Sequence, residues 1–309
     1  MRISEILKSS EKPFASIEIV PPLKGIRKDE LLRNVGRFMD YAPKYINVTS
    51  HRDDYEFVAE ADGSYSKHLV RNRISEISVC SVIREAFDVE VVPHLICGGS
   101  SKDEIESKLY NMRFLGFENV LALRGDCLSG EKRFTPQPDG YAYASELVEG
   151  IRKFEESRGE DLFSIGVGAY PEKHFEAPNL DMDIANLKKK VDAGADYIIT
   201  QMFFDNQAFY DFERRCREAG ITVPLIPGLK PISTPAQLNR LPEAFSIDIP
   251  NDLASELSAH VSDRKAVFQI GMEWCRTQCR DLLAHGVPAV HFYTMGNPDN
   301  VTSILKDCF

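Results

Sequence analysis

The sequence of 309 residues lacks long apolar runs and clusters of basic residues. No run approaches the roughly 18 apolar residues of a membrane span. The amino-terminal segment has no apolar core long enough for a signal peptide. No dense block of Lys and Arg offers a footprint for nucleic acid, and the net charge is −10. These absences argue against a membrane or nucleic-acid partner.

Paired cysteines are also missing. The seven cysteines are scattered without a Cys-x-x-Cys motif, as is typical of reduced thiols in a cytoplasmic protein. Cys275 and Cys279 lie one helical turn apart and could share a ligand, but no nearby motif completes a site. We therefore expect no metal and interpret both as semi-buried helix residues.

The composition, 43% hydrophobic and 27% charged, is that of a globular protein with a large core. Strand-like apolar segments alternate with segments whose apolar residues recur at helical spacing. The expected strands are 14–20, 44–50, 89–96, 119–124, 163–170, 196–204, 222–229 and 289–294. The expected helices are 29–40, a stretch ending at 87, then 102–115, 143–156, 180–193, 207–219, 264–283 and one beginning at 301.

These eight strand and helix pairs predict the fold class. Their single scale of spacing and the absence of a linker indicate an α/β protein, one (β/α)8 TIM barrel over residues 1–309 with a short amino-terminal helical extension. A doubly wound sheet is the structural alternative. Residues 51–67, after the second strand, are interpreted as a polar loop.

The chain is organised around NVLALRGD, residues 119–126, where an apolar strand ends in a charged turn. Interior strands of parallel barrels look continuously apolar, and the working residues collect where the strands end. Polar residues at the carboxyl ends of the expected strands should therefore face one mouth. They are Glu18, Thr49, His94, Arg124, Asp126, Tyr170, Gln201 and Thr294.

Glu18 is the sharpest candidate, because it lies inside an apolar strand between Ile17 and Ile19. An unpaired, ionised carboxylate there would cost several kcal/mol. Burial of this kind raises the pKa of a carboxyl, which lets it hold a proton near neutral pH and donate it. Pairing with an Arg or Lys across the barrel is the alternative.

Other polar residues also have two interpretations. Arg124 and Asp126, one residue apart, could form a simple ion pair across the turn, and His94 could be a satisfied core histidine. Lys230, at the end of the seventh strand, invites comparison with Schiff-base lysines. Pro231 follows it, and nothing else supports an aldolase.

Phosphate-bearing ligands need their own test. Gly166, Gly168 and Pro171 begin like a dinucleotide fingerprint, but the third glycine is absent and proline stands where the helix should open. A Rossmann site is therefore rejected. The lysine run 188–190 and the helix N-termini at the mouth are the phosphate candidates, although such a run is more often a solvated helix face.

Taken together, the motifs resemble the methylenetetrahydrofolate reductase family. Along nearly the whole chain they read SIEIVPP, VTS, VVPHLIC, LALRGD, YASELV, AYPEKH, DMDIANLKKKVDAGADYIITQMFFD, IPGLKPIS and HFYT. The resemblance implies a barrel that binds FAD and reduces 5,10-methylenetetrahydrofolate to 5-methyltetrahydrofolate by ping-pong hydride transfer from NAD(P)H, with NADH the expected donor. It also implies a homo-oligomer and the short catalytic form, without a regulatory adenosylmethionine-binding domain.

The resemblance also implies roles for individual residues. Glu18 matches the general acid that protonates N5 of the folate, and Asp126 matches an aspartate near flavin and pterin. Gln201 and Gln237 match folate-contacting glutamines. The remaining positions associated with FAD are Thr49, His94, Arg124, Gly125, Tyr143, Ala144, Tyr170, His174, Asp183, Asn186, Lys189 and Lys190.

The sequence departs from the family at three places. Leu241 stands where bacterial members often carry a stacking phenylalanine, and Asn297 where a ligand-binding arginine is usual. The segment 51–67 is longer than usual and could alter the mouth, the donor site or an oligomer contact. These departures keep open a barrel subunit reduced by an electron-transfer partner. Another FAD barrel dehydrogenase, or a corrinoid-linked methyltransferase, is the further alternative.

Overall fold

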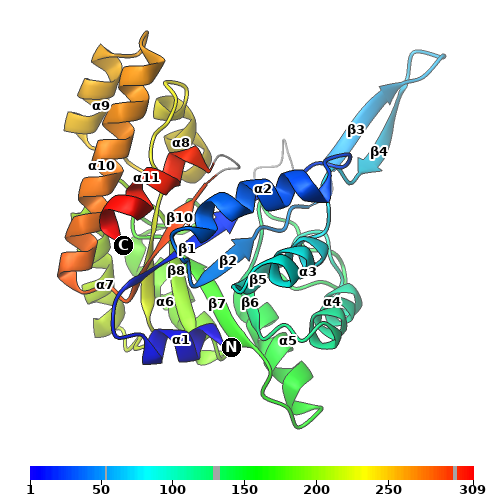
Figure 1. The fold of residues 1–309 in the computed structure, drawn as a ribbon. Coiled ribbons are helices and arrows are strands. Elements are labelled where there is room, and N and C mark those ends of the chain that lie inside the picture. The colour runs from blue at the N-terminus through cyan, green and yellow to red at the C-terminus, as the bar shows by residue number, and fades with distance from the viewer. Residues whose placement is uncertain (53, 128–132, 295–297) are drawn as a thin grey trace.

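The computed structural model describes residues 1–52, 54–127, 133–294 and 298–309. Eight parallel strands, each paired with its neighbours, close into a barrel when the last strand pairs with the first (Figure 1). The strands are β1 (Phe14–Ile19), β2 (Tyr45–Val48), β5 (Glu90–Ile96), β6 (Asn119–Leu123), β7 (Ser164–Ala169), β8 (Tyr197–Met202), β9 (Leu225–Leu229) and β10 (Ala289–Tyr293). The predicted barrel is confirmed, and the doubly wound alternative is wrong because the sheet has no open edge.

Helices follow the barrel strands and cover their outer side. They are α2 (Lys28–Met39), α3 (Glu76–Ala86), α4 (Lys102–Phe114), α5 (Ala144–Glu156), α6 (Leu180–Asp192), α7 (Asn206–Glu218), α10 (Arg264–His285) and α11 (Asp299–Cys308). Two further helices, α8 (Gln237–Phe245) and α9 (Asn251–Ala259), lie in the proline-punctuated stretch before α10. Leu147, Ile151 and Phe154 of α5 illustrate the pattern, because their helical spacing places all three on the buried face.

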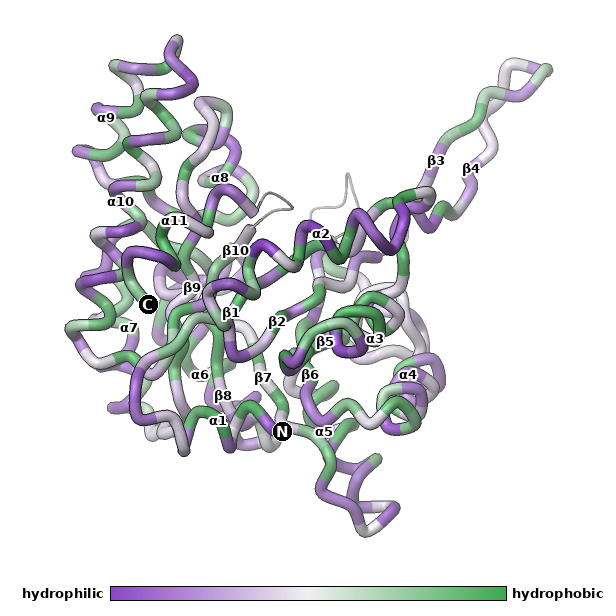
Figure 2. Tube along the Cα trace, in the orientation of Figure 1, coloured by the Kyte–Doolittle hydropathy of each residue, from purple (hydrophilic) through white to green (hydrophobic). Residues whose placement is uncertain are grey.

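Inside the barrel, successive strand residues point alternately inward and outward. The inward positions toward the amino ends are apolar or aromatic, and Tyr45, Val92, Leu121, Tyr197 and Ile226 pack there in one cluster. Further along β1, β2, β5 and β10 the inward positions are polar, and they are occupied by Ser16, Glu18, Asn47, His94 and His291. On β6 and β8 the corresponding positions stay apolar, with Leu123 and Ile199. Figure 2 shows largely hydrophobic segments at the centre of the molecule, while the outer helices mix hydrophobic and hydrophilic residues.

A short helix, α1 (Ile3–Ser9), closes the amino-terminal end of the barrel (Figure 1). Ile3 and Ile6 belong to the same apolar cluster as the inward strand residues. The backbone N–H of Ile3 donates to Asn119 Oδ1 at 2.8 Å, and that of Ser4 donates to Ser164 Oγ at 3.0 Å. The first N–H groups of a helix have no partner within it, so these two side chains fix α1 against the barrel floor. The interior is thus left open only toward the carboxyl ends.

Much of the expected polar loop forms strands instead, because residues 54–59 and 65–67 are extended and paired. Strands β3 (Asp54–Ala59) and β4 (Tyr65–Val70) pair antiparallel as a hairpin that projects away from the barrel (Figure 1). Residues 54–57 of β3 alternate between polar and apolar, which favours a strand, and Gly63 at φ +83° permits the turn that follows. Phe57 and Tyr65 are 63% and 71% exposed on this arm. The prediction was wrong because β4 (YSKHLV) lacks this alternation and the segment as a whole is polar.

Among the described residues, none of the helices combines the length and the apolar composition needed to cross a membrane.

The packing of α1 against the amino-terminal end of the barrel gives a testable prediction. Ile3→Ala should lower the free energy of unfolding by about 3 kcal/mol, because it leaves a cavity at a fully buried site in the barrel floor. Urea denaturation followed by circular dichroism measures this. Lys8→Ala, on the exposed side of the same helix, is the matched control and should change stability by less than about 0.5 kcal/mol. Equal effects of the two substitutions would show that α1 does not seal the barrel.

Candidate active site

Glu18 lies inside the mouth of the barrel between two imidazoles. Its Oε2 is 3.6 Å from His94 Nε2 and 3.7 Å from His291 Nε2, and its side chain is 14% exposed. His94 comes from β5 and His291 from β10, the strand beside β1. The alternative of an Arg or Lys partner across the barrel is therefore wrong, because the two side chains beside the carboxylate are histidines.

The two histidines are buried and differently supported. Burial lowers the pKa of His94 to about 4, so this imidazole is neutral at physiological pH. His291 Nδ1 hydrogen-bonds with Ser16 Oγ at 2.8 Å, a contact that holds the ring in place. In the part of the chain that the structure describes, neither Nε2 has a hydrogen-bond partner. Buried polar atoms normally have one, so both nitrogens are available to Glu18 or to a ligand.

Asn47 extends this polar layer. It stands opposite Glu18 in the register of β1 and β2, and it is fully buried. Neither its amide oxygen nor its amide nitrogen has a partner among the described residues. Sequence reasoning missed both Asn47 and His291. The signal was available, because each is a polar residue inside an apolar strand and shares the inward position of Glu18.

A second group of side chains gathers at the ends of β6 and β7. Lys190 of α6 donates from Nζ to the Gly168 carbonyl at 2.8 Å, and burial lowers its pKa to about 8. The backbone N–H of His174 donates to Asp183 Oδ2 at 2.9 Å. The rings of Tyr170 and His174 meet edge to face with centroids 4.7 Å apart. Five of the predicted cofactor residues, Arg124 included, are thus electrostatically coupled in one cluster.

Arg124 forms its ion pair with Glu176 rather than with Asp126. Its guanidinium also lies over the ring of Phe134, 5.0 Å from the centroid. Asp126 is exposed at the rim, and its backbone carbonyl accepts a hydrogen bond from Arg52 Nη1 at 3.4 Å. The interpretation of residues 124 and 126 as a private ion pair is therefore wrong.

Gly125 makes this turn possible. Its φ is +85°, and a Cβ placed on it would come within 3.3 Å of Ile96. Only glycine adopts such a backbone without strain. The turn separates Arg124, which points into the cluster, from Asp126 at the rim.

The structure places the remaining predicted residues less closely together. Thr49 Oγ1 contacts His51 Nε2 at 2.9 Å just beyond β2, and Thr294 Oγ1 donates to the Glu18 carbonyl at 2.7 Å. Gln201 is half-buried near the end of β8, just after a shift in the register between β8 and β9. Tyr143 is the 60% exposed N-cap of α5, and Ala144 is its buried first residue.

Other predicted residues lie away from the inner mouth. Asn186 and Lys189 bond to each other at 2.9 Å on the exposed side of α6. Gln237 Oε1 accepts the backbone N–H of Ser233 at 2.7 Å. Leu241 is 4% exposed and packs in the apolar cluster under α8, so its side chain fills core space there. Asn297 lies outside the described residues.

The sequence raised two other kinds of site, a Schiff-base lysine at Lys230 and a metal site. Lys230 is 1% exposed, and burial lowers its pKa to about 8. A lysine so enclosed cannot meet a carbonyl substrate without rearrangement. Within the described residues, no three His, Cys, Asp or Glu side chains are grouped so as to hold a metal ion.

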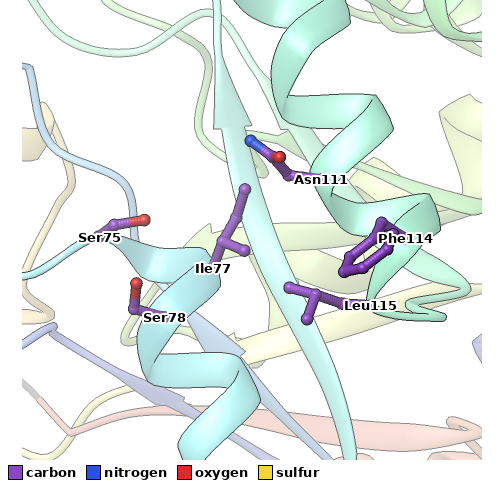
Figure 3. A pocket seen from close by; sticks show the side chains of 6 residues that line it. All are labelled: Ser75, Ile77, Ser78, Asn111, Phe114 and Leu115. Carbon is purple, nitrogen blue, oxygen red and sulfur yellow. The ribbon is translucent and has the colours of Figure 1, made fainter.

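A cavity of about 320 Å³ lies on the outer wall, between the start of α3 and the end of α4 (Figure 3). Its lining residues are Ser75, Ile77, Ser78, Asn111, Phe114 and Leu115. None of them is titratable, so this cavity can bind but cannot supply acid–base chemistry. The barrel mouth is therefore the candidate active site.

The chain matches the family model described as "Methylenetetrahydrofolate reductase" over residues 2–308. It belongs to the methylenetetrahydrofolate reductase family. It is 32% identical over 315 residues to "Methylenetetrahydrofolate reductase (NADH) 1" of Arabidopsis thaliana, a match that covers 99% of this chain and 50% of that protein. It is 30% identical to "5,10-methylenetetrahydrofolate reductase" of Salmonella typhimurium, covering 92% of this chain and 86% of that one. The chain thus spans about half the length of the plant relative.

A solved structure gives independent support for the fold. A Clostridium thermocellum protein, described as binding two copies of 5-methyl-5,6,7,8-tetrahydrofolic acid, matches with a TM-score of 0.62. The match covers 99% of this chain and 98% of that one, at 14% identity. At that identity the likeness shows the shared fold alone.

The buried His94 predicts an acid sensitivity. An imidazole whose pKa is about 4 when folded and about 6.5 when unfolded binds fewer protons in the native state. The stabilising contribution of His94 to the free energy of unfolding is therefore present at neutral pH and is lost as pH falls from about 6.5 toward 4. Between pH 7.5 and 5 the free energy of unfolding should fall by about 2 kcal/mol because of this group.

Urea denaturation of the wild type and of His94→Gln at the two pH values checks this prediction. The variant should lose less stability on acidification than the wild type does. His68→Gln, at an exposed position on the hairpin, should behave like the wild type. An unchanged acid sensitivity in His94→Gln would contradict the assignment.

Proposed function

We propose that this protein reduces 5,10-methylenetetrahydrofolate to 5-methyltetrahydrofolate, with FAD as bound cofactor and NAD(P)H as electron donor in a ping-pong cycle. The observation that carries the proposal is a carboxyl group, Glu18, held between two buried imidazoles at the inner end of the mouth. Membership of the family supports the reaction class. The plant and bacterial relatives are both named as reductases of methylenetetrahydrofolate, which supports the substrate.

The reaction requires a proton before it requires a hydride. Protonation of folate N5 opens the methylene bridge to an electrophilic iminium, and a positioned acid must supply that proton. His94 cannot be the source at neutral pH, because burial keeps its imidazole unprotonated. Glu18 is the acidic group at the inner mouth, and it lies within 3.7 Å of both histidines. We assign it as the general acid, with His94 and His291 positioning the carboxyl group.

The neighbouring amides are suited to hold the folate. Asn47, with both amide atoms unpartnered among the described residues, can offer a donor and an acceptor beside Glu18. Gln201, half-buried near the end of β8, is a second amide that we propose for contact with the folate. The amide oxygen of Gln237 is already taken by Ser233, so only its NH₂ group can reach a ligand.

The second cluster fits FAD. A flavin dinucleotide needs cations for its diphosphate and hydrogen-bonding groups for its ribityl chain and rings. Arg124 and Lys190 supply two cations at adjacent strand ends, while His174 and Asp183 are already oriented by a mutual hydrogen bond. When bound, FAD supplies the hydride chemistry, and the protein supplies orientation and proton control. Asp126, exposed at the rim, would place a negative charge beside the ring system.

Replacing the general acid should separate the two half-reactions. Glu18→Gln preserves the shape of the side chain but removes its acidic proton, so reduction of bound FAD by NADH should persist. Folate reduction should fall by about 10²–10⁴-fold, which is the usual range for a lost general acid. Stopped-flow flavin absorbance and steady-state turnover measure the two rates. Normal folate turnover in this variant would remove Glu18 from the mechanism.

A partner-reduced subunit is the second candidate. The projecting hairpin favours it, because Phe57 and Tyr65 are exposed on an arm that emerges from the mouth side of β2. The two versions differ in what the isolated protein can do. We expect NADH to bleach the flavin absorbance of the purified FAD-loaded protein within the time of one turnover. Absence of bleaching would instead support delivery of electrons by another protein.

A further inference from the structure

Three cysteines meet where the last helix packs on α10. Cys275 and Cys279 lie one turn apart on α10 and are 1% and 0% exposed. Cys308, the last residue of α11, is half-buried. The two helices lie side by side near the carboxyl terminus (Figure 1). The proposed reaction uses none of these thiols.

Cys279 and Cys308 are in direct contact. Their thiols hydrogen-bond to each other. Cys308 Sγ also lies 4.0 Å from the carbonyl oxygen of Arg276, which is one turn before Cys279. The side chain of Arg276 forms an ion pair with Asp307 at 2.7 Å, so the end of α11 is held against this part of α10. The contact of Cys308 Sγ with the Arg276 carbonyl and the ion pair of Asp307 with Arg276 therefore hold the end of α11 beside the turn of α10 that carries Cys279.

We propose that Cys279 and Cys308 form a reversible disulfide, made by exchange with a low-molecular-weight disulfide such as oxidised glutathione. The product would tie α11 covalently to α10. It does not depend on the proposed reductase activity.

The exchange takes place in two balanced steps. The Cys308 thiolate attacks one sulfur of the small disulfide, which forms a mixed disulfide and releases one small thiol that takes up the proton lost by Cys308. Cys279 then loses its proton and attacks the Cys308 sulfur, releasing the second small thiol. Both cysteine sulfurs are oxidised, and the small disulfide is reduced to two thiols.

The environments of the two thiols assign their order of reaction. The hydrogen bond from Cys279 lowers the pKa of the Cys308 thiol, which favours the attacking thiolate. The same hydrogen bond and burial raise the pKa of Cys279. Cys308 is also the more exposed of the two. It should therefore react first with an external disulfide, with Cys279 as the resolving thiol.

Cys275 serves as the matched control. It lies on the same helix, one turn from Cys279, and is equally buried. Burial raises the pKa of its thiol, and it lies near Lys230 in the enclosed region under α10. It has neither the exposure of Cys308 nor the thiol hydrogen bond of Cys279, so it should take no part in the exchange.

The experiment incubates the purified full-length protein in buffers with increasing ratios of oxidised to reduced glutathione. The free thiols are then alkylated in denaturant and the protein is analysed by intact and peptide mass spectrometry. The wild type and Cys275→Ala should each lose two alkylatable thiols and yield a peptide pair joined through Cys279 and Cys308. Cys279→Ser should instead accumulate one glutathione on Cys308, because its resolving thiol is missing. Cys308→Ser should show neither product.

Two results would overturn the proposal. One is a wild type that keeps a stable glutathione on Cys308 and forms no internal disulfide. The other is an oxidation product that disappears in Cys275→Ala. Thermal unfolding gives a second readout: the oxidised wild type should melt several degrees above its reduced form, because the bridge restricts the unfolded chain. Neither Cys279→Ser nor Cys308→Ser should show this reductant-sensitive shift.

Discussion

The structure depends on the alternation of side chains along strands that close into a barrel. Closure divides every strand into outward positions, which pack under helices, and inward positions, which share one narrow interior. Helix α1 seals the amino-terminal end of that interior through Ile3 and Ile6. Polar inward residues can therefore meet solvent or ligand only at the carboxyl ends. Glu18, His94 and His291 converge there for this reason, although they come from distant parts of the chain.

The polar layer inside the barrel places one carboxyl group beside imidazoles rather than beside a permanent cation. A carboxylate beside an Arg or Lys would be held in one charged state, whereas Glu18 lies beside imidazoles, one of which burial keeps neutral. The outer cluster brings the cations Arg124 and Lys190 together with the carboxylates Glu176 and Asp183. In the proposed function, Glu18 deep in the mouth would handle the proton, and Arg124 and Lys190 nearer the rim would hold the anionic cofactor.

The cysteines show that spacing along one helix does not decide which thiols meet in space. The spacing of Cys275 and Cys279 suggested a pair on one helix, but the hydrogen-bonded neighbour of Cys279 is Cys308 from another helix. The hairpin shows a limit of local pattern, because only the first part of β3 alternates between polar and apolar residues. Its two strands pair with each other and project away from the barrel, so no buried face imposes the usual strand pattern.

The sequence by itself determined the eight strands, their covering helices and the polar residues at the strand ends, because these follow from local periodicity and from apolar runs. It also carried the family resemblance that singled out Glu18 and Asp126. Only the tertiary structure decided the partners: two histidines for Glu18, Glu176 for Arg124, and Asn47 and His291 as members of the inner layer. Strand periodicity sets which side chains point inward, but the closure and stagger of the whole barrel set which of them touch.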